Sequence, residues 1–188
     1  MRDLLEFLMI ENKKEDWFEE RTKGHIKLVK KAAQKIVAKY PEFKELIGQA
    51  AKHDASKFLA PERDGYIELT WRLKQDKNAY KTPGTIPEKD LNGATLHHIL
   101  NNTHHPEFYG NKTAVALDPN DRHKSVNITD ASKMPDLAIA EMVADWVAMS
   151  EELKKNTARQ WYEKTKNVRW KWSEHQEELI DKLLKVFE

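Results

Sequence analysis

The sequence predicts an all-α protein, a single domain of about seven helices. Apolar residues recur at helical spacing along most of the chain, and no segment shows the alternation of a convincing strand. The length of 188 residues suits one domain and is enough to bury a core. Charged residues make up 34% of the chain, above the usual share of about a quarter, as expected for helices with a solvated face.

The first half of the chain predicts four helices, over residues 1–11, 15–39, 42–54 and 61–74. Pro41 ends the second helix, and Pro61 is well placed to begin the fourth. The pair His53-Asp54 lies at the C-terminal end of the third. The glycine and prolines within residues 75–87 then predict a loop.

The second half predicts a helix over residues 88–105 that stops at Pro106, a strongly apolar helix over 135–155, and two helices within 157–187. Residues 106–133 are polar and predict a long loop, which is either functional or disordered. The tryptophans of the last segment could pack in the core or form the interface of a homodimer; they are Trp161, Trp170 and Trp172.

The composition excludes several classes of protein. No cysteine is present, so a disulfide framework and a Cys-based metal site or nucleophile are excluded. The net charge of +1 argues against a strong nucleic-acid footprint. The N-terminal residues lack the pattern of a secretory signal, and no apolar run approaches the roughly 20 residues of a membrane span. We therefore expect a cytoplasmic protein with no membrane partner.

Histidine and aspartate recur in an order that suggests a metal site. Six of the eight histidines fall in three places: His25, the pair His53-Asp54, and the stretch LHHILNNTHHPEF over residues 96–108. Asp145 follows in AEMVADW. Because neutral imidazole and carboxylate suit divalent transition metals, we expect one or two ions of Mn, Fe, Co, Ni or Zn.

Each of these residues also has an interpretation without a metal. Adjacent helical residues point about 100° apart, so His53 and Asp54 can share an ion only at a helix end. Without an ion, Asp54 would pair with Lys57. His25 lies beside an apolar stripe, which is also typical of a core histidine. Asp145 could be a helix-surface residue beside a partly exposed Trp146. Its apolar neighbours argue against exposure, and a buried carboxylate is costly unless paired or metal-bound. Their joint occurrence favours the metal.

The four clustered histidines cannot all bind one ion from a regular helix. Seven residues span about 10 Å along a helix axis, so a shared ion requires a helix end near His104. A regular helix would place His97 and His104 at the edge of its apolar stripe, and His98 and His105 away from it. We therefore predict that His97 and His104 are metal ligands and that His98 acts on substrate. A solvent-exposed helix end is the alternative.

Lys57 and Glu141 complete the candidate site. Lys57 follows Asp54 by three residues and could neutralise a phosphate oxygen, or it could simply pair with Asp54 or Glu62 at the surface. Glu141 lies one turn before Asp145 and could orient a ligand or hold a water.

The order of His25, His53-Asp54 and Asp145 resembles the metal signature of the HD superfamily. Its members are all-α and mostly phosphohydrolases acting on nucleotides and related phosphate esters. The resemblance implies an HD-domain-like helical bundle in which these four residues hold a first ion. The extra histidines resemble the binuclear branch, where Asp54 would bridge to a second ion. The stretch HDASKF is similar to the HDxGK of HD-GYP domains, with a serine for the glycine, and this favours a role for Lys57.

The combination of HDxSKF, HHxxxNxHHxE and MPxxxxxEMxxDW more closely resembles a family of small bacterial and phage proteins with no established activity. We expect a metal-site core over about residues 15–155, with the helices of 157–187 packed on it. The expected function is hydrolysis of a small phosphate substrate, a nucleotide or related ester, by metal-activated water. Two alternatives remain: a di-iron oxygenase of the HD type, and a non-catalytic, metal-stabilised interaction module.

Overall fold

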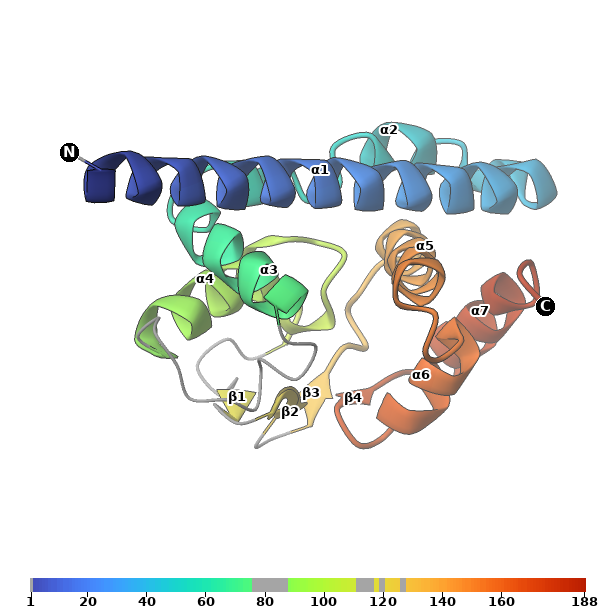
Figure 1. The fold of residues 1–188 in the computed structure, drawn as a ribbon. Coiled ribbons are helices and arrows are strands. Elements are labelled where there is room, and N and C mark those ends of the chain that lie inside the picture. The colour runs from blue at the N-terminus through green and yellow to red at the C-terminus, as the bar shows by residue number, and fades with distance from the viewer. Residues whose placement is uncertain (1, 76–87, 111–116, 119–120, 126–127) are drawn as a thin grey trace.

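The computed structural model describes residues 2–75, 88–110, 117–118, 121–125 and 128–188. It confirms the all-α fold, because seven α-helices hold most of these residues (Figure 1). The helices are α1 (Arg2–Lys39), α2 (Leu46–Ala50), α3 (Arg63–Gln75), α4 (Glu88–Asn101), α5 (Asp136–Leu153), α6 (Ala158–Thr165) and α7 (Glu174–Leu184).

Helix α1 runs through 38 residues without a break, so the prediction of separate helices over 1–11 and 15–39 was wrong. The charged run between these ranges holds no glycine or proline, and it only marks a polar stretch of one helix. One of its lysines, Lys14, pairs with Glu68 of α3. Figure 1 shows α1 crossing the molecule, with α3 beside its N-terminal half and α5 beside its C-terminal half.

Two clusters of buried apolar side chains form the core. The large cluster joins the C-terminal half of α1 to α2, α5, α6 and α7, and its fully buried members include Ile36, Leu46, Ile139 and Ile180. The small cluster joins α1 to α3 and α4, and it consists of Phe18, Tyr66, Ile67, Leu69 and Ala94. Helix α1 is the element that the two clusters share.

The C-terminal tryptophans belong to the large cluster. Trp170 and Trp172 are 3% and 5% exposed, and Trp161 is partly buried against the same residues. Of the two interpretations of these side chains, packing in the core is therefore the one observed. Helices α6 and α7 both begin with a capping box, in which Thr157 and Ser173 accept from backbone N–H groups that would otherwise lack partners.

The helix predicted over 42–54 is shorter than expected. A 3₁₀ turn, Pro41–Phe43, precedes α2, and turns carry the chain from Ala51 to Asp54. A second 3₁₀ turn, Ala55–Phe58, leads toward α3. The pair His53-Asp54 therefore lies in a turn, where the two side chains are not bound to helical directions.

The helix predicted over 88–105 ends at Asn101, and a 3₁₀ turn over Pro106–Phe108 follows. The expectation of no strand was wrong in detail. Strand β1 (Leu117–Asp118) pairs antiparallel with β2 (Asp121–Ser125), and β3 (Thr129–Asp130) pairs in parallel with β4 (Trp170–Lys171). The loop predicted over 75–87 falls, after Gln75, outside the described residues.

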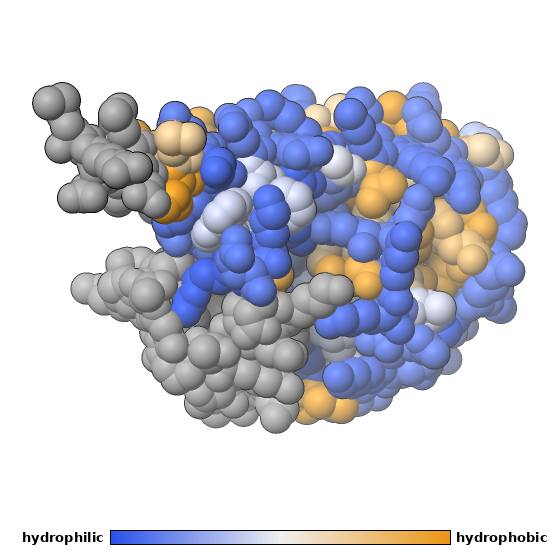
Figure 2. Space-filling model, in the orientation of Figure 1, coloured by the Kyte–Doolittle hydropathy of each residue, from blue (hydrophilic) through white to orange (hydrophobic). Residues whose placement is uncertain are grey.

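Among the described helices, none combines the length and apolar character that crossing a bilayer would require. The face of the molecule seen in Figure 2 is mostly hydrophilic, with scattered apolar patches over the half that holds α5, α6 and α7. This surface agrees with helices that bury one side and solvate the other.

Candidate metal centre

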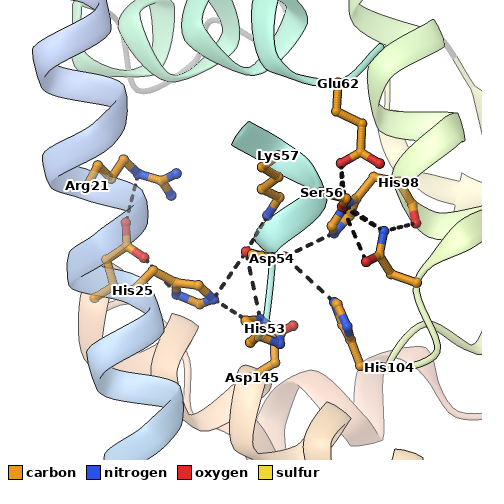
Figure 3. Close-up of polar contacts among 12 residues, drawn as sticks. Arg21, His25, His53, Asp54, Ser56, Lys57, Glu62, His98, His104 and Asp145 are labelled. Atoms are coloured by element: carbon orange, nitrogen blue, oxygen red, sulfur yellow. Dashed lines mark hydrogen bonds and ion pairs between the residues drawn. The ribbon is translucent and has the colours of Figure 1, made fainter. Parts of the chain in front are cut away.

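Histidines and carboxylates from segments far apart in the sequence form one buried group (Figure 3). Five segments of the chain supply it. His25 comes from α1, the pair His53-Asp54 from the turn after α2, and Asp145 from α5. Helix α4 and the turn after it supply the remaining histidines, which are His98, His104 and His105.

Asp54 has a left-handed backbone conformation, with φ of 59°. Non-glycine residues rarely adopt it, although aspartate and asparagine do so more readily than most. Such a conformation costs about 1–3 kcal/mol and persists only where the surrounding structure holds it. It directs the 2%-exposed Asp54 carboxylate into the centre beside His53, which a regular helix could not do.

The Asp54 carboxylate faces histidines on both sides. Its Oδ1 lies 3.1 Å from Nε2 of His98 and 3.8 Å from Nε2 of His104. Its Oδ2 lies 3.7 Å from Nε2 of His53 and 3.9 Å from Nε2 of His25. This carboxylate is therefore placed to be shared by two sets of imidazoles.

Asp145 completes the set on the Oδ2 side. Its Oδ1 lies 2.9 Å from Nε2 of His25 and 3.7 Å from Nε2 of His53. These three residues offer ligand atoms that all lie within 4.8 Å of one another, as do two further groups. The further groups are His53, Asp54 and His104, and His98, His104 and His105.

Three glutamates face the Nδ1 atoms of four of these imidazoles, on the side of each ring away from Asp54. Nδ1 of His25 lies 3.3 Å from Oε2 of Glu152, and Nδ1 of His98 lies 2.8 Å from Oε2 of Glu62. Glu141, only 3% exposed, serves two rings through Oε1, at 3.0 Å from Nδ1 of His53 and 3.6 Å from Nδ1 of His104. Metal-binding histidines typically donate their second N–H to such a carboxylate, which fixes the ring and its tautomer.

Several inward atoms are left without hydrogen bonds. Nε2 of His53, Oδ1 of Asp54, Nε2 of His98 and Nε2 of His105 are all buried, and none has a hydrogen-bond partner among the described residues. When Nδ1 of His53 and of His98 donates to Glu141 and Glu62, the inward Nε2 of each neutral ring keeps a lone pair that can bind a cation. The donor set of nitrogen and oxygen atoms fits a divalent transition metal.

The electrostatics of the centre favour the ionised carboxylates. Burial alone would raise the pKa of Asp54 and Asp145, but nearby Lys57 and His53 lower the first, and His25 and His53 lower the second, so both lie well below their ordinary values. Burial lowers the pKa of His53, but Asp54 and other carboxylates outweigh it and raise the pKa to about 10. In metal-free protein, a proton on His53 therefore offsets charge that a metal ion would otherwise neutralise.

The pKa values of two histidines on the Oδ1 side of Asp54 shift in the opposite direction to that of His53. Burial lowers the pKa of His104 and His105 well below the ordinary value, and the neighbouring histidines lower it further. Their rings lie 4.2 Å apart between centroids. Both are therefore neutral at pH 7, which is the form that binds metal.

The structure brings together five of the six residues predicted as metal ligands: His25, His53, Asp54, His104 and Asp145. His97 does not join them. Its side chain is 39% exposed, and its Nδ1 contacts Glu62 at 2.8 Å. The predicted orientation of the His97-His98 pair was wrong, because His98 is the buried member at 2% exposed. The short α4 points His98 inward, and the turn after Asn101 brings His105 back against it.

Lys57 and Glu141 both lie beside the centre, and Lys57 forms the pair with Asp54 that was the alternative to a phosphate contact. The Nζ of Lys57 is 2.6 Å from Oδ2 of Asp54, and its side chain is 19% exposed, so it contacts both the centre and solvent. Two further glutamates, Glu62 and Glu152, were not foreseen as partners of the histidines. Their sequence surroundings carry no distinguishing signal, because charged residues are frequent along this chain.

A family model matches residues 14–188, and the family is described as one of unknown function, DUF5662. The chain belongs to this family. No curated protein and no solved structure matches it. The match includes every residue of the centre and both apolar clusters.

Proposed function

We propose that this DUF5662 protein is a metal-dependent phosphohydrolase acting on a small phosphate ester of the nucleotide type. The observation that supports it most is the Asp54 carboxylate, whose two oxygens face two separate sets of imidazoles. A carboxylate shared in this way suits a pair of ions, and paired ions are common in enzymes that hydrolyse phosphate esters. The resemblance of the His-Asp motifs to HD phosphohydrolases points in the same direction.

The residues divide into two sets. His25, His53, Asp54 and Asp145 would hold a first ion, and Asp54 with His98, His104 and His105 would hold a second. Ions bound there would lower the pKa of a water molecule and polarise a phosphoryl oxygen. The ammonium group of Lys57 lies beside Asp54. There it would stabilise the negative charge on an oxygen of the bound phosphate. The three glutamates, Glu62, Glu141 and Glu152, would keep the imidazoles oriented.

The same set of ligands suits iron, so a di-iron oxygenase of the HD type is the second candidate. Imidazole suits iron as well as zinc and nickel, and the availability of each metal helps to decide which one is bound. The identity of the metal and the consumption of oxygen separate the two classes.

The test is metal content together with activity. Protein purified without chelator is analysed for metals, then reconstituted separately with Mn²⁺, Fe²⁺, Co²⁺, Ni²⁺ and Zn²⁺, and assayed on p-nitrophenyl phosphate and a panel of nucleotides. Asp54→Asn is the variant, because asparagine tolerates the left-handed conformation at this position. His175→Ala is the matched control, because His175 is exposed and its imidazole pairs with Asp136, which is not part of the centre.

Hydrolysis that requires metal, is lost in Asp54→Asn and persists in His175→Ala would support the proposal. Iron with oxygen consumption but no hydrolysis would favour the oxygenase. A folded wild-type protein that binds none of the five metals would refute both, and it would leave the non-catalytic interaction module.

A further inference from the structure

Glu62 is a buried carboxylate beside the centre. It belongs to neither of the two proposed sets of metal ligands. None of its surface is exposed. A buried charge is costly unless several partners compensate it. Oε1 lies 2.8 Å from Nδ1 of His97, while Oε2 lies 2.8 Å from Nδ1 of His98 and accepts a hydrogen bond of 2.9 Å from Ser56. Glu62 therefore gathers three donors, one of them from a candidate ligand.

These contacts determine the tautomer of His98. A carboxylate compensated by three donors is an acceptor only, so the proton between Glu62 and His98 lies on Nδ1 of the imidazole. Asn102 also approaches this nitrogen, at 3.0 Å, but its Nδ2 has better acceptors in the carbonyl oxygen of His98 at 2.9 Å and Oγ of Ser56 at 3.1 Å. Nε2 of His98 then carries the lone pair, and it points toward Oδ1 of Asp54 at 3.1 Å.

We infer that Glu62 is a positioning residue for the second ion: it holds His98 with Nε2 available to the metal beside Oδ1 of Asp54. The inference rests on the proposed metal centre and adds a residue to it. A carboxylate behind a metal-binding histidine raises its basicity, and its loss typically weakens metal binding by about 10–100-fold.

Glu152 provides a matched control on the other side of the centre. Its Oε2 faces Nδ1 of His25 at 3.3 Å, without the hydrogen bond that joins Glu62 to His98, so it lies behind a candidate ligand of the first ion rather than of the second. Glu141 is unsuitable for this purpose, because it faces both His53 and His104 and so contacts both sets. Replacing either Glu62 or Glu152 by glutamine keeps the shape of the side chain and removes its charge.

The experiment compares Glu62→Gln, Glu152→Gln, the double variant and the wild type. Each protein is stripped of metal and titrated with Co²⁺, with calorimetry giving the affinities and the visible absorption bands reporting coordination at each step. We expect two ions in the wild type. Glu62→Gln should weaken the second ion by about 10–100-fold and leave the first unchanged. Glu152→Gln should do the reverse, with a different Co²⁺ spectrum for the ion retained, and the double variant should weaken both.

Wild-type binding of both ions by folded Glu62→Gln would overturn the inference. So would a double variant no weaker than one of the single variants, because both glutamates would then act on the same ion. If the wild type itself bound no Co²⁺, the proposed function would fail together with the inference. Should Glu62→Gln fail to fold, Ser56→Ala takes its place, since it removes one donor from Glu62; unchanged binding of the second ion would then be the contrary result.

Discussion

The large and small apolar clusters differ in what holds them together. The large cluster packs α5 and α7 against α1 through fully buried aliphatic side chains such as Ile36, Ile139 and Leu183. The small cluster has only a few apolar members among the described residues, and charged groups add to it, including Lys14 with Glu68. Partly exposed ion pairs contribute about 0–1 kcal/mol each. The region of α3 and α4 therefore depends on the polar centre more than the region of α5 and α7 does.

The largest expected effect comes from a matched pair of isoleucines, one in each cluster. Truncating a buried isoleucine to alanine costs about 2–5 kcal/mol, with the higher values where the cavity cannot collapse. We expect Ile139→Ala, at 0% exposed, to fall near the upper end and Ile67→Ala, at 5%, near the lower end. Urea unfolding of the metal-free variants measures both. Equal costs would remove the contrast between the clusters.

Removal of the metal should destabilise the region of α3 and α4 more than the region of α5 and α7, without any substitution. A ligand at about 100 times its Kd stabilises the state that binds it by about 2.7 kcal/mol. Because His98 lies on α4, a bound ion should protect α3 and α4 most. Hydrogen exchange with and without metal tests this. We expect faster exchange in α4 after metal removal and little change in α7; uniform acceleration along the chain would speak against it.

The stability of metal-free protein should be highest near pH 6.5. The pKa of His53 is raised from 6.5 to about 10, so its contribution is complete below pH 6.5 and is lost as the pH rises toward 10. The pKa values of His104 and His105 are lowered, so the unfolded chain takes up protons below pH 6.5 that these folded side chains do not, and stability falls there too.

Unfolding in urea at pH 5, 6.5, 8 and 9.5 would show this maximum. Saturating metal should flatten the alkaline limb, because the ion displaces the proton from His53. If the stability of the metal-free protein rose steadily from pH 6.5 to 9.5, the raised pKa of His53 would be contradicted.

The smallest effect belongs to a helix cap in the large cluster's region. Ser173→Ala removes the side chain that accepts from Gln176 N at the start of α7. The loss should be about 0.5–2 kcal/mol. Thermal unfolding measures it, with Co²⁺ affinity as the control. A change in metal affinity would mean that the two regions are coupled more tightly than their packing indicates.

Much of the helical fold could be predicted because apolar spacing and prolines mark it. The beginning of α5 after Pro135 and the end of α1 before Pro41 are examples. The pairing of β3 with β4 could not be predicted, because two-residue strands carry no periodicity and their partners lie far apart in the sequence.

For the site, the sequence indicated which residue types gather, and the structure shows how they face one another. His25, His53, Asp54 and Asp145 were identified by their order, and they do lie together. The orientation of His97 and His98 was predicted wrongly, because it depends on where α4 ends and how it is rotated. Glu62 and Glu152 gain their role only from tertiary contacts.

The uninterrupted helix α1 has a consequence for how the chain folds as it is synthesised. Its main partner, α5, begins at Asp136, nearly 100 residues after α1 ends at Lys39. Helices α2 and α3 emerge earlier and cover part of α1, but contacts with the distant α5 form slowly. The histidines of the centre have all been synthesised by residue 105, so Asp145 of α5 would be the last candidate ligand to join them.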